Sequence, residues 1–435
     1  MTGWRAWALR LGLAAALGLA LFSNSVRVSD EVLHAPSAMP DRVILTWSGD
    51  PATTQSVTWR TSVGVEGARA QIAEAGDGPD FTKQSDEVKA ASELLKSDLG
   101  EAAYHSVTFQ KLKPSTVYAY RVGDGTNWTE WHQFRTASDK PAPVEFLYVG
   151  DAQNDILSLW SRVVRTGYRE ASKAHFFIHA GDLVNRGTSD ALWGEWFRAG
   201  GWLNATLPSV PVPGNHEYGR TDGKRTVTDH WRRQYTLPEN GAPGLEETSY
   251  YIDIQGVRIV GLNSNEKHEE QAQWLDALLE KNPNRWTICT FHHPIFSTAR
   301  GRDNKELREL WQPVFDKHGV DLVLQGHDHS YGRSNLLSGT NNKSGGTVYV
   351  VSVSGPKMYE LDRHEWMQRK AEDTQLFQII RIDGDRLQFE SRTARGALYD
   401  AFELRKQTGG PNVIVNKAPE MPERLRKPAA TPSGD

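Results

Sequence analysis

The stretch Val144-Glu145-Phe146-Leu147-Tyr148-Val149-Gly150-Asp151 decides the fold of the larger part of this chain, because an apolar strand ends directly in Gly-Asp. A second apolar strand, residues 175–179, ends in Ala180-Gly181-Asp182 after an intervening amphipathic stretch. Strands that alternate with helices predict an α/β layered domain, which we place at residues 143–405. Further strand-like runs cover residues 209–212, 286–291, 320–324, 347–353 and 377–382.

Residues 38–138, ahead of that domain, show the two-residue periodicity of half-buried strands. Val57 and Trp59 alternate with polar residues, as do Val107 and Phe109. This alternation predicts one buried and one wet face for each strand. Pro and Gly-Asp clusters separate the runs, so we expect a small antiparallel β-sandwich. Residues 138–143 form a plausible linker between the two domains.

The two ends of the chain differ from both domains. Arg5 and Arg10 precede the apolar residues 11–22, a run too short for a comfortable membrane span, and Ser23-Asn24-Ser25 follows. This pattern predicts a signal peptide over residues 1–25 and a periplasmic or extracellular protein with no membrane span in its mature form. An uncleaved anchor is the alternative, since Ala-x-Ala is absent. Residues 406–435 are rich in Pro and charge, and we expect a disordered tail.

Bulk composition excludes some classes of function. The chain has 435 residues and a formal net charge of −4, without a long run of one sign. A nucleic-acid partner is therefore not indicated. The single cysteine, Cys289, excludes a disulfide within the chain, and its apolar surroundings predict an inert core residue.

Five short segments place a metal-capable group at the C-terminal end of an apolar run. In α/β sheets, ligands gather beyond these strand ends. Glycine at such a position allows the backbone to turn sharply away from the strand. The segments are Gly150-Asp151-Ala152-Gln153, Gly181-Asp182-Leu183-Val184-Asn185, Gly214-Asn215-His216-Glu217, Phe291-His292-His293-Pro294 and Gly326-His327-Asp328-His329.

Any one of these segments alone is an ordinary turn, helix cap or core histidine, but together they indicate a metal centre. Carboxylate and imidazole ligands suit Zn, Fe or Mn. The candidates are too many for one tetrahedral ion, but they suit two ions that share a carboxylate and clamp a phosphoryl group. The candidate ligands are Asp151, Gln153, Asp182, Asn215, His292, His327 and His329.

These blocks resemble the calcineurin-like metallophosphoesterase superfamily. Residues 112–123 and Phe134-Arg135-Thr136 are similar to the fibronectin-III-like N-terminal domain of purple acid phosphatases, so the resemblance covers roughly residues 40 to 400. It implies that Asp182 bridges two divalent or mixed-valence ions. It also implies that His216 contacts the phosphate and protonates the leaving group. The ligands implied for the first ion are Asp151 and His329, and those for the second are Asn215, His292 and His327.

Three positions depart from the family pattern. Asn185 occupies the place of the tyrosinate that colours purple acid phosphatases, so we expect no purple protein. Gln153 replaces a histidine found in other members; its carbonyl oxygen would favour Mn, Fe(II) or Zn. Arg300-Gly301-Arg302 occupies a region where plant-type enzymes have further histidines. Arginine holds phosphate but is a poor proton donor, which leaves His216 as the leading acid.

The resemblance implies hydrolysis of a small-molecule phosphomonoester by direct attack of a metal-bound hydroxide on phosphorus. A phosphodiesterase or nucleotide hydrolase on the same site is the alternative. A non-catalytic cell-surface binding protein is a further interpretation, but Asp182 and the Asn215-His216 pair, which it should have lost, are both present. The natural substrate, the metal pair and the oligomeric state are not set by these motifs.

Overall fold

The computed structural model describes residues 28–221, 223–339 and 345–426, so the predicted signal segment, residues 1–25, lies outside the described part. The chain divides into two compact units, Met1–Ala35 and Pro36–Asp435. The first contains the short helix α2 (Asp30–Leu33), and every described strand belongs to the second. No helix among the described residues has the length and apolar character needed to cross a membrane.

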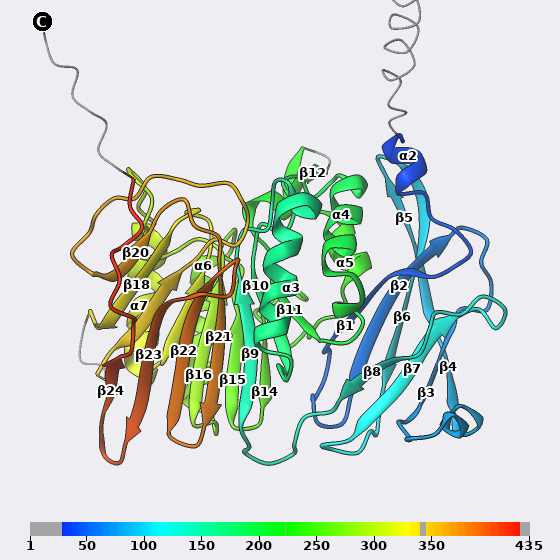
Figure 1. The fold of residues 1–435 in the computed structure, drawn as a ribbon, viewed down its shortest axis with the longest axis horizontal. Helices are drawn as coiled ribbons and strands as arrows, with labels where there is room; N and C mark the ends of the chain where they lie inside the picture. Colours follow the sequence, from blue (N-terminus) through cyan, green and yellow to red (C-terminus); the bar gives the residue numbers. More distant parts are fainter. Residues whose placement is uncertain (1–27, 222, 340–344, 427–435) are drawn as a thin grey trace, which may run out of the picture. The chain divides into compact units, whose positions relative to one another are not determined.

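The N-terminal part of the second unit is the predicted antiparallel β-sandwich (Figure 1). Its core joins Val57 and Trp59 from one sheet to Tyr120, Val122 and Phe134 from the other. A short helix, η1 (Pro79–Gln84), precedes β4. One sheet is β1 (Asp41–Thr46), β2 (Gln55–Ser62), β6 (Gly100–Phe109) and β5 (Ala91–Ser97); the other is β4 (Asp86–Lys89), β3 (Arg69–Glu74), β7 (Val117–Gly123) and β8 (His132–Arg135).

The expectation of a wet outer face is wrong for β2. Its polar residues are buried because they contact the following domain. Thr58 Oγ1 lies 3.0 Å from Thr236 Oγ1, and Arg60 Nη1 donates to Asp190 Oδ2 at 3.1 Å. The two-residue alternation therefore separates an apolar core from a polar domain interface.

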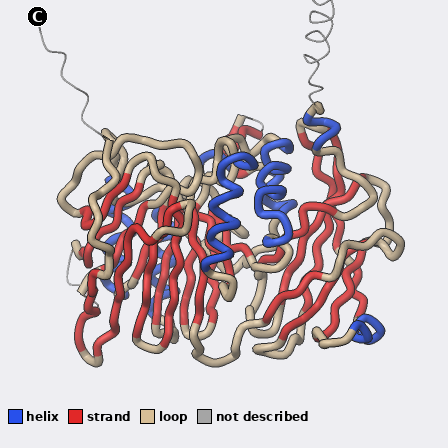
Figure 2. The backbone as a smooth tube through the Cα atoms, in the orientation of Figure 1, coloured by secondary structure: helices blue, strands red, loops and turns tan. Residues whose placement is uncertain are grey.

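The C-terminal part contains two seven-stranded mixed sheets that pack face to face (Figures 1 and 2). One is β11 (Ser209–Val212), β10 (Phe176–Ala180), β9 (Val144–Val149), β21 (Leu376–Asp383), β22 (Arg386–Thr393), β23 (Leu398–Gln407) and β24 (Gly410–Asn416). The other is β14 (Tyr250–Ile254), β15 (Val257–Gly261), β16 (Trp286–Phe291), β17 (Leu322–Gln325), β19 (Thr347–Val351), β18 (Tyr331–Leu337) and β20 (Met367–Ala371).

Helices cover the outer faces of both sheets, so the predicted α/β layered domain has an α/β/β/α arrangement (Figure 1). On α7, Leu307, Trp311 and Phe315 recur every four residues and are buried, as an amphipathic helix requires. They pack in the same layer as Cys289, which is fully buried, as predicted for an inert core residue. The helices are η2 (Ile156–Trp160), α3 (Ser161–Glu170), α4 (Asp190–Gly200), η3 (Gly201–Leu203), η4 (Asn215–Glu217), α5 (Asp229–Gln234), α6 (His268–Glu280) and α7 (Lys305–His318); β12 (Tyr218–Thr221) and β13 (Lys224–Val227) form a hairpin.

The predicted disordered tail is wrong at its start. Residues 410–416 form β24, which pairs antiparallel with β23 and extends the first sheet beyond residue 405. Asn412 also donates its Nδ2 hydrogen to Asp321 Oδ1 at 2.7 Å. An edge strand is held by main-chain bonds, so its polar composition resembles that of a loop. Residues 427–435 lie outside the described part of the chain.

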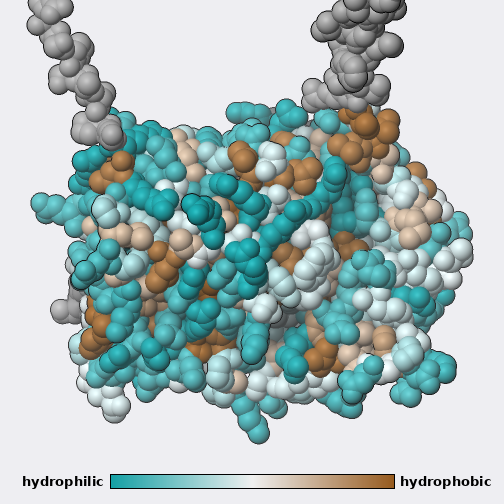
Figure 3. Space-filling view, in the orientation of Figure 1, coloured by the Kyte–Doolittle hydropathy of each residue, from teal (hydrophilic) through white to brown (hydrophobic). Residues whose placement is uncertain are grey.

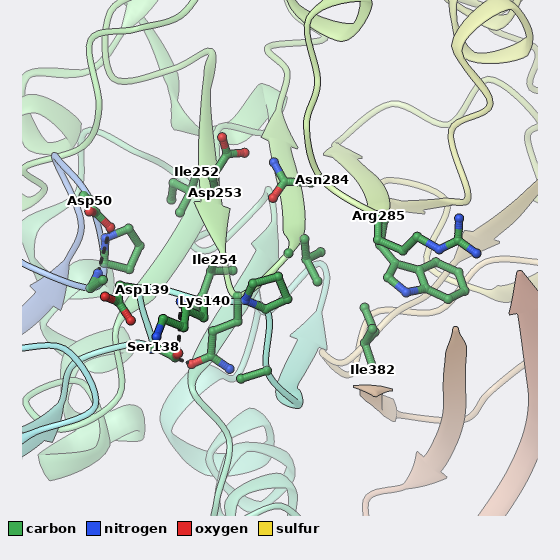
Figure 4. Close-up of a pocket in the computed structure, with 18 of the residues that line it drawn as sticks. Asp50, Ser138, Asp139, Lys140, Ile252, Asp253, Ile254, Asn284, Arg285 and Ile382 are labelled. Atoms are coloured by element: carbon green, nitrogen blue, oxygen red, sulfur yellow. Dashed lines mark hydrogen bonds between the residues drawn. The ribbon is translucent and has the colours of Figure 1, made fainter. Parts of the chain in front are cut away.

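A groove of about 930 Å³ runs along the linker, at the N-terminal ends of β9, β15 and β16. Figure 4 shows Ser138 and Lys140 on one side of it and Arg285 on the other. Gln255 fixes the linker there, because its side chain accepts from Ser138 N at 3.0 Å and donates to Pro143 O at 2.6 Å. The face drawn in Figure 3 is mostly hydrophilic, with small separate apolar groups.

Candidate metal centre

Five parallel strands carry the candidate ligands at their C-terminal ends. Strands β9, β10 and β11 are neighbours in one sheet and lead to Asp151, Asp182 and Asn215. Strands β16 and β17 are neighbours in the other sheet and lead to His292 and His327. The candidates therefore meet where the C-terminal edges of two packed sheets come together, as expected for open α/β sheets.

The first group of donors consists of Asp151, Asp182 and His329, whose ligand atoms all lie within 4.8 Å of one another. All three are buried. Gln153 completes the group, with its Nε2 2.9 Å from Asp182 Oδ2 and 3.0 Å from His329 Nε2. The buried Oε1 of Gln153 has no hydrogen-bond partner among the described residues. Rotation of the amide exchanges its nitrogen and oxygen, so Gln153 can present an oxygen to this group.

The second group converges on His292 Nε2. This atom lies 3.1 Å from Asn215 Oδ1, 3.1 Å from His327 Nδ1 and 3.2 Å from Asp182 Oδ2. The other ring nitrogen, Nδ1, lies 3.0 Å from the carbonyl oxygen of Ala180 and therefore carries the hydrogen of the neutral ring. The lone pair of Nε2 then faces the group, an arrangement typical of metal-binding histidines.

Asp182 Oδ2 belongs to both groups. It lies 2.9 Å from Gln153 Nε2 on one side and 3.2 Å from His292 Nε2 on the other. On the first side, rotation of the Gln153 amide presents an oxygen, and on the second side the imidazole nitrogen of His292 faces the group, so each side could hold one cation. The donor set thus fits a dinuclear centre, and the structure brings together all seven candidates named from the sequence.

Strained backbone accompanies this convergence. Asp151, Asp182, His327 and His329 have φ values of 52°, 51°, 72° and 47°, in the left-handed region that non-glycine residues seldom adopt. Such conformations persist where surrounding structure imposes them and cluster at functional sites.

Most glycines that precede the candidate ligands do not provide the unusual backbone turn that the sequence analysis expected of them. Of the glycines that precede candidate ligands, only Gly181 has a positive φ, of 83°. A Cβ at Gly214 would lie 2.1 Å from Asp182 Oδ1, and one at Gly326 would lie 2.6 Å from Asp151 Oδ2. Glycine is needed at these two positions to leave room for the carboxylates.

In the protein without bound cations, a proton on His292 balances the charge of the buried carboxylates. Burial opposes a charge on His292, but Asp182 and Asp151 outweigh it and raise its pKa to about 9. Asp182 is also buried, yet the pKa of its carboxyl is lowered, chiefly by His292. Burial and Lys357 lower the pKa of His329 to about 3, so this ring is neutral. Bound cations would replace the proton on His292.

The backbone of Asn185, the residue at the position of the family's tyrosinate, orients His216 toward the same centre. Its Nδ1 lies 2.7 Å from the carbonyl oxygen of Asn185, which can only accept a hydrogen bond. Nδ1 therefore carries a hydrogen, and Nε2 lies 3.9 Å from Asp182 Oδ2. Its side chain is 28% exposed, so His216 can meet both a substrate and the centre.

Three polar residues of the quoted segments were not given roles by the sequence reasoning, and the structure places all of them at the centre. Glu217 binds the backbone of the Asp182 loop. His293 lies 4.3 Å from His327, ring to ring, and its Nδ1 lies 2.8 Å from Ser264 Oγ. Asp328 accepts hydrogen bonds from Thr298 N and Ala299 N. The motif letters identified these positions, but only the contacts show what each side chain does.

Two family descriptions match the chain. One is the purple acid phosphatase N-terminal domain, over residues 40–136, and the other is the calcineurin-like phosphoesterase, over residues 144–331. The second includes the segments of Asp151, Asp182, Asn215, His292 and His327.

The chain consists of a purple acid phosphatase N-terminal domain followed by a calcineurin-like metallophosphoesterase domain.

The chain is distantly similar to purple acid phosphatases and to other acid phosphatases. Purple acid phosphatase 21 of Arabidopsis thaliana is 28% identical over 263 residues, which are 58% of this chain and 58% of that protein. Acid phosphatase type 7 of Homo sapiens is 28% identical over 349 residues, 72% of this chain and 74% of its own. The match thus spans little more than half the length of the Arabidopsis protein.

Solved structures agree with the fold of this metallophosphoesterase. A purple acid phosphatase from yellow lupin (Lupinus luteus) seeds has a TM-score of 0.70 at 18% identity and covers 84% of this chain and 74% of its own. A structure of PhoD has a TM-score of 0.63 at 12% identity and covers 90% of this chain and 94% of its own. At these identities the likeness establishes the architecture alone.

Proposed function

We propose that this metallophosphoesterase hydrolyses phosphomonoesters at a dinuclear metal centre. The observation that carries this proposal is the position of Asp182 Oδ2, shared between the Gln153 side and the His292 side of the donor set. One carboxylate between two donor groups is what a pair of adjacent cations requires.

The chain's own residues divide between the two cation positions. Asp151, Gln153 and His329 would hold the first cation, and Asp182 would contact both. Asn215, His292 and His327 would hold the second. When bound, the cations, which we expect to be Fe, Mn or Zn, polarise the phosphoryl group and lower the pKa of water.

His216 supplies the proton that the leaving group needs. Its Nδ1 is fixed by the Asn185 carbonyl at 2.7 Å, which leaves Nε2 as the atom that can exchange a proton with a substrate. A water oxygen bonds to phosphorus and gives up a proton to solvent while the bond between phosphorus and the ester oxygen breaks. At the same time the hydrogen on protonated Nε2 passes to that ester oxygen. The alcohol then leaves neutral, and His216 becomes neutral.

Metal removal combined with two chromogenic substrates tests this proposal. Chelation should abolish hydrolysis of an aryl phosphomonoester, and added Mn, Fe or Zn should restore it. Hydrolysis that survives chelation, with metal absent by elemental analysis, would exclude a dinuclear mechanism. Faster hydrolysis of the matching bis-aryl phosphodiester would overturn the monoesterase assignment in favour of a diesterase. Absence of both activities in the metal-loaded protein would favour a binding protein.

A further inference from the structure

Two cationic side chains surround one tyrosine beside the first donor group. Lys357 Nζ lies 5.4 Å from the centre of the Tyr359 ring, and Arg302 Cζ lies 4.8 Å from the same centre. The Tyr359 ring lies 4.7 Å from the ring of His329. All three side chains are only partly buried, so a solute can reach them. None of the three is a candidate metal ligand.

Backbone contacts hold this cluster to the candidate ligands. His329 Nδ1 donates to the carbonyl oxygen of Lys357 at 3.0 Å, and Tyr359 N donates to the carbonyl oxygen of His329 at 3.0 Å. Arg302 Nη1 donates to the carbonyl oxygen of His327 at 3.1 Å. The backbone of Lys357 and the guanidinium group of Arg302 are therefore fixed relative to the centre by the residues that build it.

The positive charge of the cluster is incompletely neutralised. Within the described residues, no carboxylate lies within 4.0 Å of Lys357 Nζ. Arg302 faces Asp328 Oδ1 at 3.3 Å, so among the described residues one paired carboxylate stands against two cationic side chains. Neighbouring Arg300, by contrast, is paired with Glu360 at 2.8 Å. Like charges held around one ring repel each other, and a bound anion would offset that repulsion.

We propose that Lys357, Arg302 and Tyr359 form a second anion subsite, which binds a negatively charged group of the substrate other than the phosphoryl group that reacts. The subsite rests on the proposed function, since it serves the same centre. It selects phosphoesters that carry a further carboxylate or phosphate, because the two cations attract anionic oxygens and the ring supports the carbon frame beside them.

Non-hydrolysable phosphonates test the subsite without relying on catalysis. Phenylphosphonate and its 3- and 4-carboxylated derivatives are titrated into the metal-loaded protein by calorimetry. At least one carboxylated compound should bind about five- to tenfold more tightly than phenylphosphonate, and salt should weaken that preference. Lys357→Met and Arg302→Met should each reduce it, whereas Lys357→Arg should keep it. Lys83→Met, the same change on an exposed lysine of the sandwich, should also keep it.

Each outcome has a distinct meaning. Equal binding of all three phosphonates by the wild-type protein overturns the subsite, as does an unchanged preference in both methionine variants. Should Lys357→Met not fold, Arg302→Met and the salt dependence of the wild-type protein decide the question. A preference for the carboxylated compounds in a protein that hydrolyses no ester would support the subsite while the proposed function fails.

Discussion

The carboxylate of Glu217 accepts a hydrogen bond from the backbone N–H of Asp182 at 2.9 Å. The same carboxylate accepts from Gly214 N at 2.7 Å, Leu183 N at 2.9 Å and Val184 N at 3.2 Å. Burial and Asp182 raise the pKa of Glu217 to about 8, although the backbone N–H groups of Gly214 and Val184 act in the opposite direction. One buried side chain thus ties the loop of the shared carboxylate to the loop of Asn215.

Glu217→Gln should destabilise the protein and weaken its metal binding. The new amide NH₂ would face backbone N–H groups and leave buried donors without acceptors, at a loss of about 1–3 kcal/mol. Urea unfolding and metal content after dialysis measure the two effects. Glu269→Gln, on the exposed face of α6, should stay within about 0.5 kcal/mol of wild type. Equal stability of the two variants would show that the Glu217 contacts contribute nothing.

Asp182→Ala should be more damaging than Gln153→Ala. Asp182 Oδ2 lies between both donor groups, so its loss should remove metal from both positions and nearly all activity. Gln153 contacts the first group only, and its loss should reduce metal affinity roughly 10- to 100-fold, with rescue by excess metal. Measurements of metal stoichiometry, and of hydrolysis rate at rising metal concentration, distinguish the Asp182→Ala variant from the Gln153→Ala variant. Similar behaviour of both variants would contradict the shared role of Asp182.

His216→Ala should keep both metals and lose rate. The expected loss is roughly 10²–10⁴-fold, and it should be larger for an alkyl phosphate than for an ester with an acidic phenol as leaving group. The reason is that an alkoxide needs a proton to leave, whereas an acidic phenolate does not. Elemental analysis with rate measurements on both ester types provides the check. Loss of metal, or an identical rate loss for both esters, would refute proton transfer by His216.

The iron-loaded protein should lack the visible absorption band of an iron–tyrosinate pair. Asn185 meets His216 through its backbone carbonyl and supplies no phenolate at this position. Asn185→Tyr could create the band, which absorption spectroscopy of iron-loaded protein would detect. A purple wild-type protein would require another tyrosine near the first donor group. Tyr359, beside His329, is the residue to replace by phenylalanine in that case.

An interdomain ion pair should contribute strongly to stability. Arg42 of the sandwich donates to both carboxylate oxygens of Asp190 on α4 at 2.7 Å, and Arg60 donates to Oδ2 at 3.1 Å. Asp190→Asn leaves the buried guanidinium of Arg42 without its carboxylate, whereas Arg60 keeps its pair with Asp41 at 2.6 Å. The substitution should lower the free energy of unfolding by about 3–5 kcal/mol. As the control, Asp385→Asn breaks the pair between Arg285 and Asp385, whose side chains are 49% and 62% exposed. This change should lower the free energy of unfolding by about 0–1 kcal/mol.

The same pair predicts a pH dependence of stability. Burial would raise the pKa of Asp190, but His230, Arg42 and Arg60 lower it below its ordinary value of 3.8. A carboxyl with a depressed folded-state pKa stabilises fully above its unfolded pKa and loses that contribution as pH falls. Wild type should therefore lose stability below about pH 4, and Asp190→Asn should lose less over the same range. The free energy of unfolding, measured with urea, is compared for the two proteins from about pH 5 to about pH 2. An equal fall in both proteins would contradict this role of Asp190.

Sequence patterns identified most of the centre because the relevant information is local. A strand that ends in glycine and an acidic, amide or imidazole side chain is visible in a few adjacent letters, as at Gly150-Asp151 and Gly214-Asn215. Parallel strands place those ends at one edge of a sheet. Residues distant in the chain could therefore be assigned to one centre before any contact was known.

Long-range contacts explain what the sequence did not show. Arg302 meets the Tyr359 ring, 57 residues further along the chain, only in the folded protein, and nothing near Arg302 in the sequence marks that contact. The polar face of β2 reads as wet because the partner of Arg60, Asp190, lies 130 residues further on.

The sequence by itself determined the class of each domain, the strands that lead to the centre and the identity of the candidate ligands. These depend on local periodicity and on residue chemistry. Only the tertiary structure decided that Asp182 Oδ2 lies between both donor groups, that Glu217 holds the loops and that residues 410–416 complete a sheet. Those relationships are hydrogen bonds and packing between segments far apart in the chain, and a linear pattern does not specify which distant atoms meet.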